Sequence, residues 1–246
     1  MMLLPARRIT RTTRALIAAA FLASVSFLAP AKPALMAAST PAPASNSRNW
    51  AGFAITGSSP RSISAHWTVP AMTGRGSVAI WIGLGGDPQH RLLQTGTLTR
   101  QTRKGASTML WIEGLPAPMV PIATALRPGT PISVTIQRVR GPHWTLTLAA
   151  GAFFWSRTLA YPLDPHSAEW IVEDPKMESL RPHFAKFGRF TPVAFTHSTA
   201  VINNQIVTPS SGTAIQMATQ RGVWALPSLA ATGLTVTRTI PGAAKA

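Results

Sequence analysis

The sequence contains no cysteine, one tyrosine, and only 7 acidic residues against 23 lysines and arginines in 246 residues. The absence of cysteine excludes a disulfide framework, a thiolate metal site and a cysteine nucleophile. Charged residues make up 12% of the chain, about half the usual share. Hydrophobic residues make up 46%, which predicts a folded protein. The length suits one large all-β domain.

The formal net charge of +16 first suggests a nucleic acid or another anionic partner. The basic residues are mostly single and scattered, however, and the densest group, 100–104, holds only three. We therefore expect no nucleic-acid partner. Tolerance of acid explains this charge better. Carboxylates that are ionised and paired in the folded state must take up protons as the pH falls, which lowers the stability of the fold, and this chain has few carboxylates. A genome rich in G and C, which favours arginine, is the plainer alternative.

Several familiar catalytic motifs are missing from the sequence. It has no His-Glu-x-x-His, no Gly-x-Ser-x-Gly, and neither Asp-Thr-Gly nor Asp-Ser-Gly. The only local group of metal-ligand types is Asp164, His166 and Glu169, and such a trio is more typical of a polar loop. We expect no metal and no other cofactor. A Ser-His-Asp triad assembled from distant residues stays open.

The N-terminus has the organisation of a secretory signal. A basic region, 7–14, precedes the uncharged and largely apolar stretch 15–31, which ends in Ala-Pro-Ala. That stretch is short for a membrane span and is interrupted by Pro30. We predict a signal peptide over 1–31, an Ala-, Pro- and Ser-rich leader or tether over 32–47, and secretion to the cell exterior or periplasm. No membrane association is expected after cleavage.

One domain is expected over 48–246, because short runs of β-branched and aromatic residues recur there between turn-forming residues. Only 176–187 has even a weak helical pattern, and Pro182 interrupts it. About ten or more strands without helices predict an all-β sandwich or barrel. The clearest strands are 62–69, 77–84, 108–113, 132–139, 144–148, 168–173 and 234–238.

Eight short segments stand in an order that resembles the glutamic peptidases, the eqolisin family. They are Asn49-Trp50-Ala51-Gly52, Trp67-Thr68-Val69-Pro70, Trp81-Ile82-Gly83-Leu84-Gly85-Gly86, Leu92-Leu93-Gln94-Thr95-Gly96, Trp111-Ile112-Glu113, Ala168-Glu169-Trp170-Ile171-Val172-Glu173-Asp174, Phe184-Ala185-Lys186-Phe187 and Val201-Ile202-Asn203-Asn204-Gln205. The resemblance implies a sandwich of two bent antiparallel sheets, similar to the jelly roll of concanavalin-like lectins. It also implies a catalytic pair formed by Gln94 and Glu173.

The resemblance further implies that Trp50, Trp81 and Glu113 line the substrate cleft, and we add Glu169 as a substrate-binding residue. The chain also departs from the family. Three positions that carry aspartate in fungal members hold other residues here, namely Gly85, Leu98 and Met109. We expect this loss of acids to alter substrate preference and pH profile while leaving the chemistry intact.

The residues themselves give partial support to this pair. In a strand, Glu169, Ile171 and Glu173 face one way and Trp170 and Val172 the other. The two glutamates are about 13 Å apart along the strand, so at most one of them pairs with Gln94. Alternation leaves open which one; the resemblance favours Glu173.

The leading hypothesis is a secreted, monomeric endopeptidase that acts on proteins or peptides in acid. Ionised Glu173 would act as general base on water, and the Gln94 amide would stabilise the oxyanion. Because the protein is strongly basic, we expect the pKa of Glu173 to stay near the ordinary value for Glu and activity to peak below about pH 5. The alternatives are a non-catalytic, lectin-like binding module and a basic envelope protein that binds anionic polymers.

Overall fold

The computed structural model describes residues 45–241 except 58, 87–90, 178–182 and 185. They form strands joined by short turns, with one 3-10 helix, η1 (Pro209–Ser211). No helix in this part of the chain is long and apolar enough to span a membrane. The strands are β1 (Ser45–Ser47), β2 (Trp50–Thr56), β3 (Pro60–Thr68), β4 (Gly76–Gly86), β5 (Arg91–Thr102), β6 (Gly105–Gly114), β7 (Val120–Ala123), β8 (Pro131–Arg140), β9 (His143–Ala150), β10 (Phe153–Ala160), β11 (Ser167–Glu173), β12 (Lys176–Met177), β13 (His183–Phe184), β14 (Val193–Ile202), β15 (Gln205–Val207), β16 (Thr213–Thr219), β17 (Gly222–Ala230) and β18 (Gly233–Arg238).

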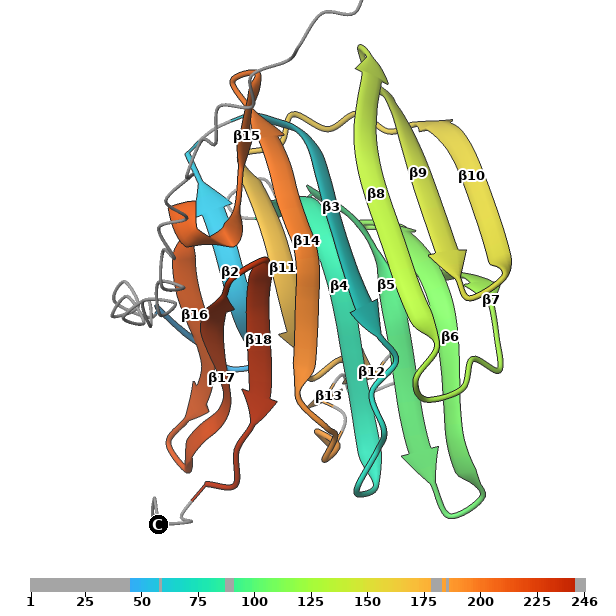
Figure 1. The fold of residues 1–246 in the computed structure, drawn as a ribbon, viewed down its shortest axis with the longest axis vertical. Helices are drawn as coiled ribbons and strands as arrows, with labels where there is room; N and C mark the ends of the chain where they lie inside the picture. Colours follow the sequence, from blue (N-terminus) through green and yellow to red (C-terminus); the bar gives the residue numbers. More distant parts are fainter. Residues whose placement is uncertain (1–44, 58, 87–90, 178–182, 185, 242–246) are drawn as a thin grey trace, which may run out of the picture. The chain divides into compact units, whose positions relative to one another are not determined.

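The strands form a sandwich of two layers, which confirms the predicted fold class (Figure 1). One hydrogen-bonded path runs β10-β9-β8-β3-β14-β18-β17-β16-β2-β11-β4-β5-β6-β7. It turns back between β17 and β16, so that β3 and β14 face β11 and β4 across the core. Neighbours along this path are antiparallel, and β1 adds to β16 in parallel. Strands from distant parts of the sequence therefore meet in the centre of each layer.

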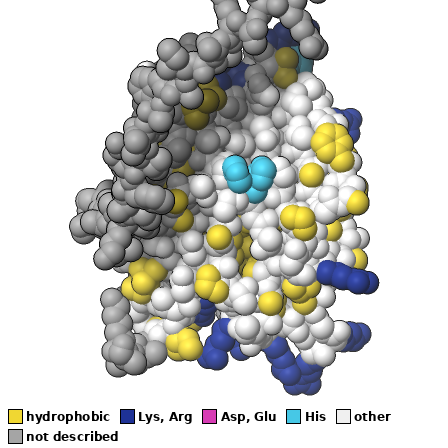
Figure 2. Space-filling view, in the orientation of Figure 1, with side chains coloured by type: hydrophobic (Ala, Val, Ile, Leu, Met, Phe, Trp, Pro, Cys, Tyr) yellow, Lys and Arg dark blue, Asp and Glu magenta, His cyan; other side chains and the backbone are white. Residues whose placement is uncertain are grey.

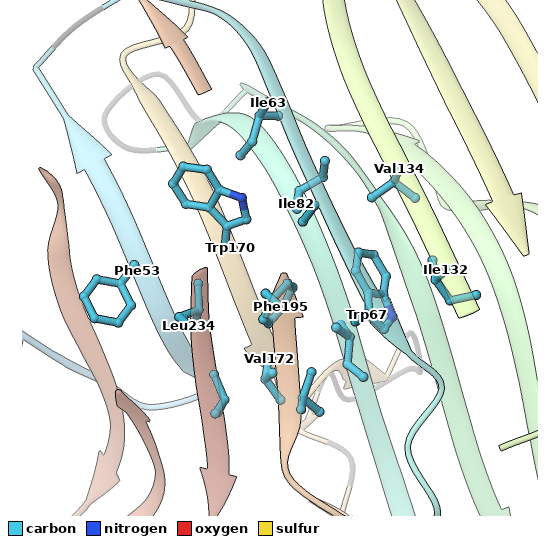
Figure 3. Packing of buried hydrophobic residues seen from close by; sticks show 14 of the residues in the cluster. Phe53, Ile63, Trp67, Ile82, Ile132, Val134, Trp170, Val172, Phe195 and Leu234 are labelled. Atoms are coloured by element: carbon cyan, nitrogen blue, oxygen red, sulfur yellow. The ribbon is translucent and has the colours of Figure 1, made fainter. Parts of the chain in front are cut away.

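The main core lies between the layers and takes alternate side chains from each strand. From β11 it receives Trp170 and Val172, which pack among Phe53, Trp67 and Phe195 (Figure 3). The Trp170 indole donates a hydrogen bond of 3.0 Å to the Ser64 carbonyl, so its polar atom is satisfied although the ring is buried. Removing this ring would leave a large cavity. The core therefore fixes which face of β11 is inward and which is outward.

A second, smaller apolar cluster covers the opposite face of β4, β5, β6 and β11. Its buried members are Ala79, Trp81, Leu92, Leu98, Trp111 and Ile171. Consequently β4 and β11 are buried on both faces, unlike strands with one solvated side. Polar side chains that project from this outer face therefore lie in an environment with little water.

The sequence identified most of the central strands. The seven runs singled out correspond to β3, β4, β6, β8, β9, β11 and β18. The segment 176–187, which has a weak helical pattern interrupted by Pro182, forms no helix in its described residues, which instead make two short antiparallel strands, β12 and β13. A helix of this length is marginal in water, and Pro182 removes one of its hydrogen bonds.

The predicted signal peptide and most of the predicted tether lie outside the described residues. The last three residues of that tether, Ser45–Ser47, form β1 and pair with Ile215 to Met217 of β16. The ordered sandwich thus begins three residues before the expected boundary at 48.

Candidate active site

The predicted site residues project from one outer face, on strands that are neighbours in the sheet. Gln94 of β5 is in register with Gly83 of β4 on one side and with Glu113 of β6 on the other. Glu169 and Glu173 belong to β11, the next strand beyond β4, in register with Gly83 and Ala79 respectively. Trp50 of β2 is in register with Glu173. The fold therefore brings all six predicted side chains to one face of the sheet.

Gln94 is held by a carboxylate. Its Nε2 donates a hydrogen bond of 2.5 Å to Oε2 of Glu113 on the adjacent strand. The Gln94 side chain is only 6% exposed, and its Oε1 is buried without a protein hydrogen-bond donor. A buried amide oxygen without a donor costs free energy unless water or a ligand supplies one. Glu113 thus fixes the orientation of the amide, and the second N–H of Nε2 remains as a donor.

Glu173 is held by two donors from separate segments. The Trp81 indole Nε1 donates to its Oε2 at 2.8 Å, and Asn49 Nδ2 donates to its Oε1 at 3.0 Å. Trp50 packs edge-on against Trp81, with ring centroids 5.1 Å apart and an interplanar angle of 80°. Each carboxylate oxygen is therefore fixed in direction by a different side chain.

Burial raises the pKa of Glu173 to about 7, with a further contribution from the negative charge of Glu113. The hydrogen bonds from Trp81, Trp50 and Asn49 act in the opposite direction but are outweighed. The expectation of an ordinary pKa is therefore wrong. It relied on the overall positive charge of the chain, whereas the groups that determine this pKa are desolvating apolar neighbours, neutral donors and a second carboxylate.

The Trp81 ring links the two predicted catalytic residues. A Cβ at Gly83 would lie 2.9 Å from Cζ3 of Trp81 and 3.3 Å from Cβ of Gln94. The benzo end of the indole therefore lies over Gly83, beside Gln94, while the nitrogen end binds Glu173. This placement needs glycine at 83, because a methyl group there would displace the ring. Trp81 is fully buried, so it positions Glu173 instead of offering surface to a substrate.

Glu169 lies in the same row of the sheet as Gln94, separated from it by Gly83. It is only 4% exposed, and Ser167 Oγ donates a hydrogen bond of 2.7 Å to its Oε1. A Cβ on Gly86 would lie 2.5 Å from that oxygen. Backbone register thus places Glu169 nearer to Gln94 than Glu173 is. The close packing of Gly86, however, covers the carboxylate of Glu169.

Asp164, His166 and Glu169, the trio considered as a metal site, do not assemble into one. No group of three or more His, Cys, Asp or Glu suited to a metal ion occurs in the described part of the chain. Glu169 points to the outer face and bonds Ser167, whereas Asp164 is exposed in the segment before β11.

The peptidase A4 family model matches residues 48–239, which is most of the chain. The chain belongs to the peptidase A4 family. It is therefore a glutamic peptidase, an endopeptidase that hydrolyses peptides, and this supersedes the lectin-like and envelope-protein alternatives. A search of curated proteins by sequence found no match.

Solved structures of eqolisins share the fold of this peptidase. Scytalido-glutamic peptidase, solved with a transition-state analogue inhibitor, has 22% identity and a TM-score of 0.70, with 78% of this chain and 98% of that chain covered. SCP-B, an eqolisin solved with the tripeptide Ala-Ile-His, has 21% identity over the same shares, with a TM-score of 0.66. Aspergilloglutamic peptidase from Aspergillus niger has 24% identity and a TM-score of 0.58, covering 66% and 99%.

The structure adds Asn49 to the residues that the sequence assigned to this eqolisin site. Asn49 binds Glu173 through its side chain, and its carbonyl accepts a hydrogen bond of 2.9 Å from the Asp174 amide. In the sequence, Asn49 is only the first residue of a family motif. That motif was the available signal, but a separation of 124 positions between Asn49 and Glu173 concealed the contact.

Proposed function

We propose that this eqolisin cleaves peptide bonds in acid with Gln94 and Glu173 as its catalytic pair, and that it is secreted. The observation that carries the proposal is the pair of supported side chains on one face. Glu113 fixes the Gln94 amide, and Trp81 with Asn49 fixes the Glu173 carboxyl. Such supporting hydrogen bonds hold catalytic groups in position before the substrate binds.

Glu173 is favoured over Glu169 as the proton-transfer group because of the surroundings of each carboxyl. Glu173 is partly exposed, whereas Glu169 is buried beneath Gly86. The Trp81 indole binds Glu173 through its nitrogen and lies over Gly83 beside Gln94, so one ring contacts the surroundings of both side chains. A carboxyl with a raised pKa beside a fixed amide is also a frequent feature of catalytic sites.

The raised pKa changes the expected order of proton transfers. In acid, Glu173 begins protonated, so we propose that it first donates its proton to the carbonyl oxygen of the scissile bond. As water attacks the carbon, the resulting carboxylate acts as general base and takes a proton from that water. Until that proton is fully transferred, the oxygen carries partial negative charge, and a hydrogen bond from the Gln94 amide stabilises it. Glu173 then protonates the leaving nitrogen and recovers a proton from the tetrahedral intermediate as the C–N bond breaks.

This order predicts that kcat/KM is highest below about pH 5 and falls as the pH rises through the pKa of Glu173 at about 7. One pH unit above that pKa, at pH 8, only about a tenth of the sites keep the proton, so we expect about a tenfold loss. The measurement is a pH–rate profile on a fluorogenic peptide, with EDTA as a control expected to have no effect. A rate that instead rises up to pH 7 would show that the ionised carboxylate acts first. Full inhibition by EDTA would indicate a metal mechanism.

Secretion gives a separate expected result. The mature protein should begin between Lys32 and Ser47, because the predicted signal ends at 31 and β1 begins at Ser45. N-terminal sequencing of protein recovered from the medium or periplasm tests this. Recovery of the chain only in the membrane fraction, with Met1 retained, would contradict it.

A further inference from the structure

A cavity of about 1130 Å³ opens at the end of the sandwich where β11 finishes. Asp174, which follows Glu173, lines it, and so does Arg48, which precedes Asn49. Phe187 and Met217, which also line it, belong to the main core cluster, so the cavity opens on the core side at the end of the sandwich, one residue along the chain from Glu173 and from Asn49. Its volume exceeds the range of about 300–1,000 Å³ typical of small-molecule pockets, so it has room for a short peptide segment.

Six of the side chains that line this cavity are cationic, and Asp174 is the one acidic residue among them. They come from five separate parts of the chain, namely the β1–β2 turn, the β3–β4 loop, the segment before β14, the β16–β17 turn and the end of β18. In order, the residues are Arg48, Arg75, Lys186 with Arg189, Arg221 and Arg238. Charges that are scattered in the sequence are thus concentrated by the fold. Figure 2 shows Lys and Arg side chains toward the lower end of the molecule, where β18 finishes and β17 begins in Figure 1.

Arg238 is the fixed member of this basic cavity. Its guanidinium carbon lies 4.7 Å from the Phe187 ring centroid and 4.8 Å from that of Trp224. Its Nε donates to the Gly188 carbonyl and its Nη1 to the Trp224 carbonyl, both at 3.1 Å. Burial and the nearby charge of Arg189 lower the pKa of Arg238. Like charges are therefore held together at a free-energy cost, which a bound anion would offset.

Asp174 contributes little negative charge to the cavity in acid. Burial, together with the charge of Glu173, raises the pKa of Asp174 to about 7 against the opposing effect of Arg238. Its Oδ1 is buried without a hydrogen-bond partner. A protonated carboxyl can donate a hydrogen bond to an anion, so below its pKa this residue complements the six cations.

We propose that the basic cavity is a secondary subsite that binds an acidic segment of the peptide substrate, a few residues away from the bond that is cleaved. The inference rests on the proposed function only in taking the catalytic face as the place of cleavage. A peptide is the favoured anion because the chain is a peptidase and the cavity opens at the end of β11, one residue beyond Glu173, where an extended substrate can reach it around the end of the sheet. Arginines from several segments lie at the rim of the cavity, so they can pair with carboxylates spaced along an extended peptide.

The test compares two peptides that share one cleavable sequence and carry either a Glu-Glu-Glu or a Gln-Gln-Gln tail. At pH 5.5 the Glu carboxylates are mostly ionised, and we expect kcat/KM to be about tenfold higher for the Glu tail, as for two or three exposed ion pairs. The triple variant Arg75→Gln, Arg189→Gln, Arg221→Gln should reduce this ratio to about 1 and leave the Gln-tailed peptide unaffected. All three arginines are exposed on the rim, so folding should be preserved.

A matched control removes three exposed arginines elsewhere, Arg103, Arg140 and Arg157, which do not line the cavity. This control should keep the tenfold preference; if it also loses the preference, overall charge explains the effect and the subsite is refuted. Equal rates for the two tails in the unmodified enzyme would also refute it, while leaving the proposed function intact.

A binding measurement separates the subsite from catalysis. Fluorescence anisotropy of the labelled Glu-tailed peptide on the Glu173→Gln variant should show binding that the triple arginine variant weakens about tenfold. Binding without cleavage in the unmodified enzyme would support the subsite and refute the catalytic assignment. Displacement of the peptide by a single-stranded oligonucleotide at lower concentration than by unlabelled Glu-tailed peptide would overturn the assignment to peptides.

Discussion

Replacement of Glu173 by glutamine should reduce kcat/KM about 10²- to 10⁴-fold, the usual contribution of a positioned acid–base group. Glutamine keeps the size of the side chain but cannot exchange a proton with water or the leaving amine. Its Oε1 can still accept a hydrogen bond from Trp81 or Asn49, the two donors that hold the carboxyl. The measurement is peptide cleavage by the variant at its optimal pH, alongside circular dichroism to verify the fold.

Loss of the Gln94 amide should have an effect of similar size. Gln94→Ala removes the group proposed to stabilise the oxyanion, which is typically worth about 10²- to 10³-fold in kcat. It also leaves Glu113 without the hydrogen bond that Gln94 supplies. Glu113→Gln is the informative companion, because a positioning role predicts a smaller loss, mainly in kcat, with KM little changed.

Glu169→Gln is the control for both dyad variants. Glu169 shares the outer face and the row of Gln94 but is covered and bonded to Ser167. We expect this variant to lose less than tenfold activity. If the Glu169 variant is inactive and the Glu173 variant is active, the catalytic role belongs to Glu169. Proximity to Gln94 in the sheet would then decide which glutamate is catalytic, and accessibility of the carboxyl would not.

The folded protein should become more stable as the pH falls from 8 to 4, unlike proteins that depend on ionised carboxylates. The pKa of Glu173 is about 7 in the folded state, whereas its ordinary value is 4.5. The folded state therefore binds more protons than the unfolded state between these values. Stability is greatest below about pH 4.5, decreases as the pH rises toward 7, and levels off above it. Asp174 acts in the same direction.

The size of this effect follows from the shift. The difference between the folded-state pKa of Glu173 and its ordinary value corresponds to a change of at most about 3 kcal/mol in the free energy of unfolding between pH 4 and pH 8. Urea unfolding at several pH values measures it. Glu173→Gln should remove the part of this dependence that Glu173 contributes, leave the part that Asp174 contributes, and raise stability at pH 8, while Asp164→Asn, which changes an exposed carboxyl, should retain all of it. Equal pH dependence in the unmodified protein and the Glu173 variant would refute the burial argument.

The sequence by itself determined the local properties of this protein. Alternation of side chains in 168–173 placed Glu169 and Glu173 on one face and Trp170 on the other, because a strand repeats every two residues whatever its neighbours are. Turn-forming residues between apolar runs predicted an all-β sandwich or barrel. The ordered motifs indicated the eqolisin family and, through it, Gln94 and Glu173 as the candidate pair before any contact was known.

Only the tertiary structure decided how those strands meet. It placed Glu113 opposite Gln94 and brought Asn49 to Glu173, and it concentrated scattered arginines around one cavity. It also surrounded the partly exposed Glu173 carboxyl with desolvating neighbours, which raises its pKa to about 7. Strand order, burial and charge clustering all depend on contacts between residues far apart in the chain. Desolvation in particular is set by the atoms that surround a group in space, which no local pattern in the sequence specifies.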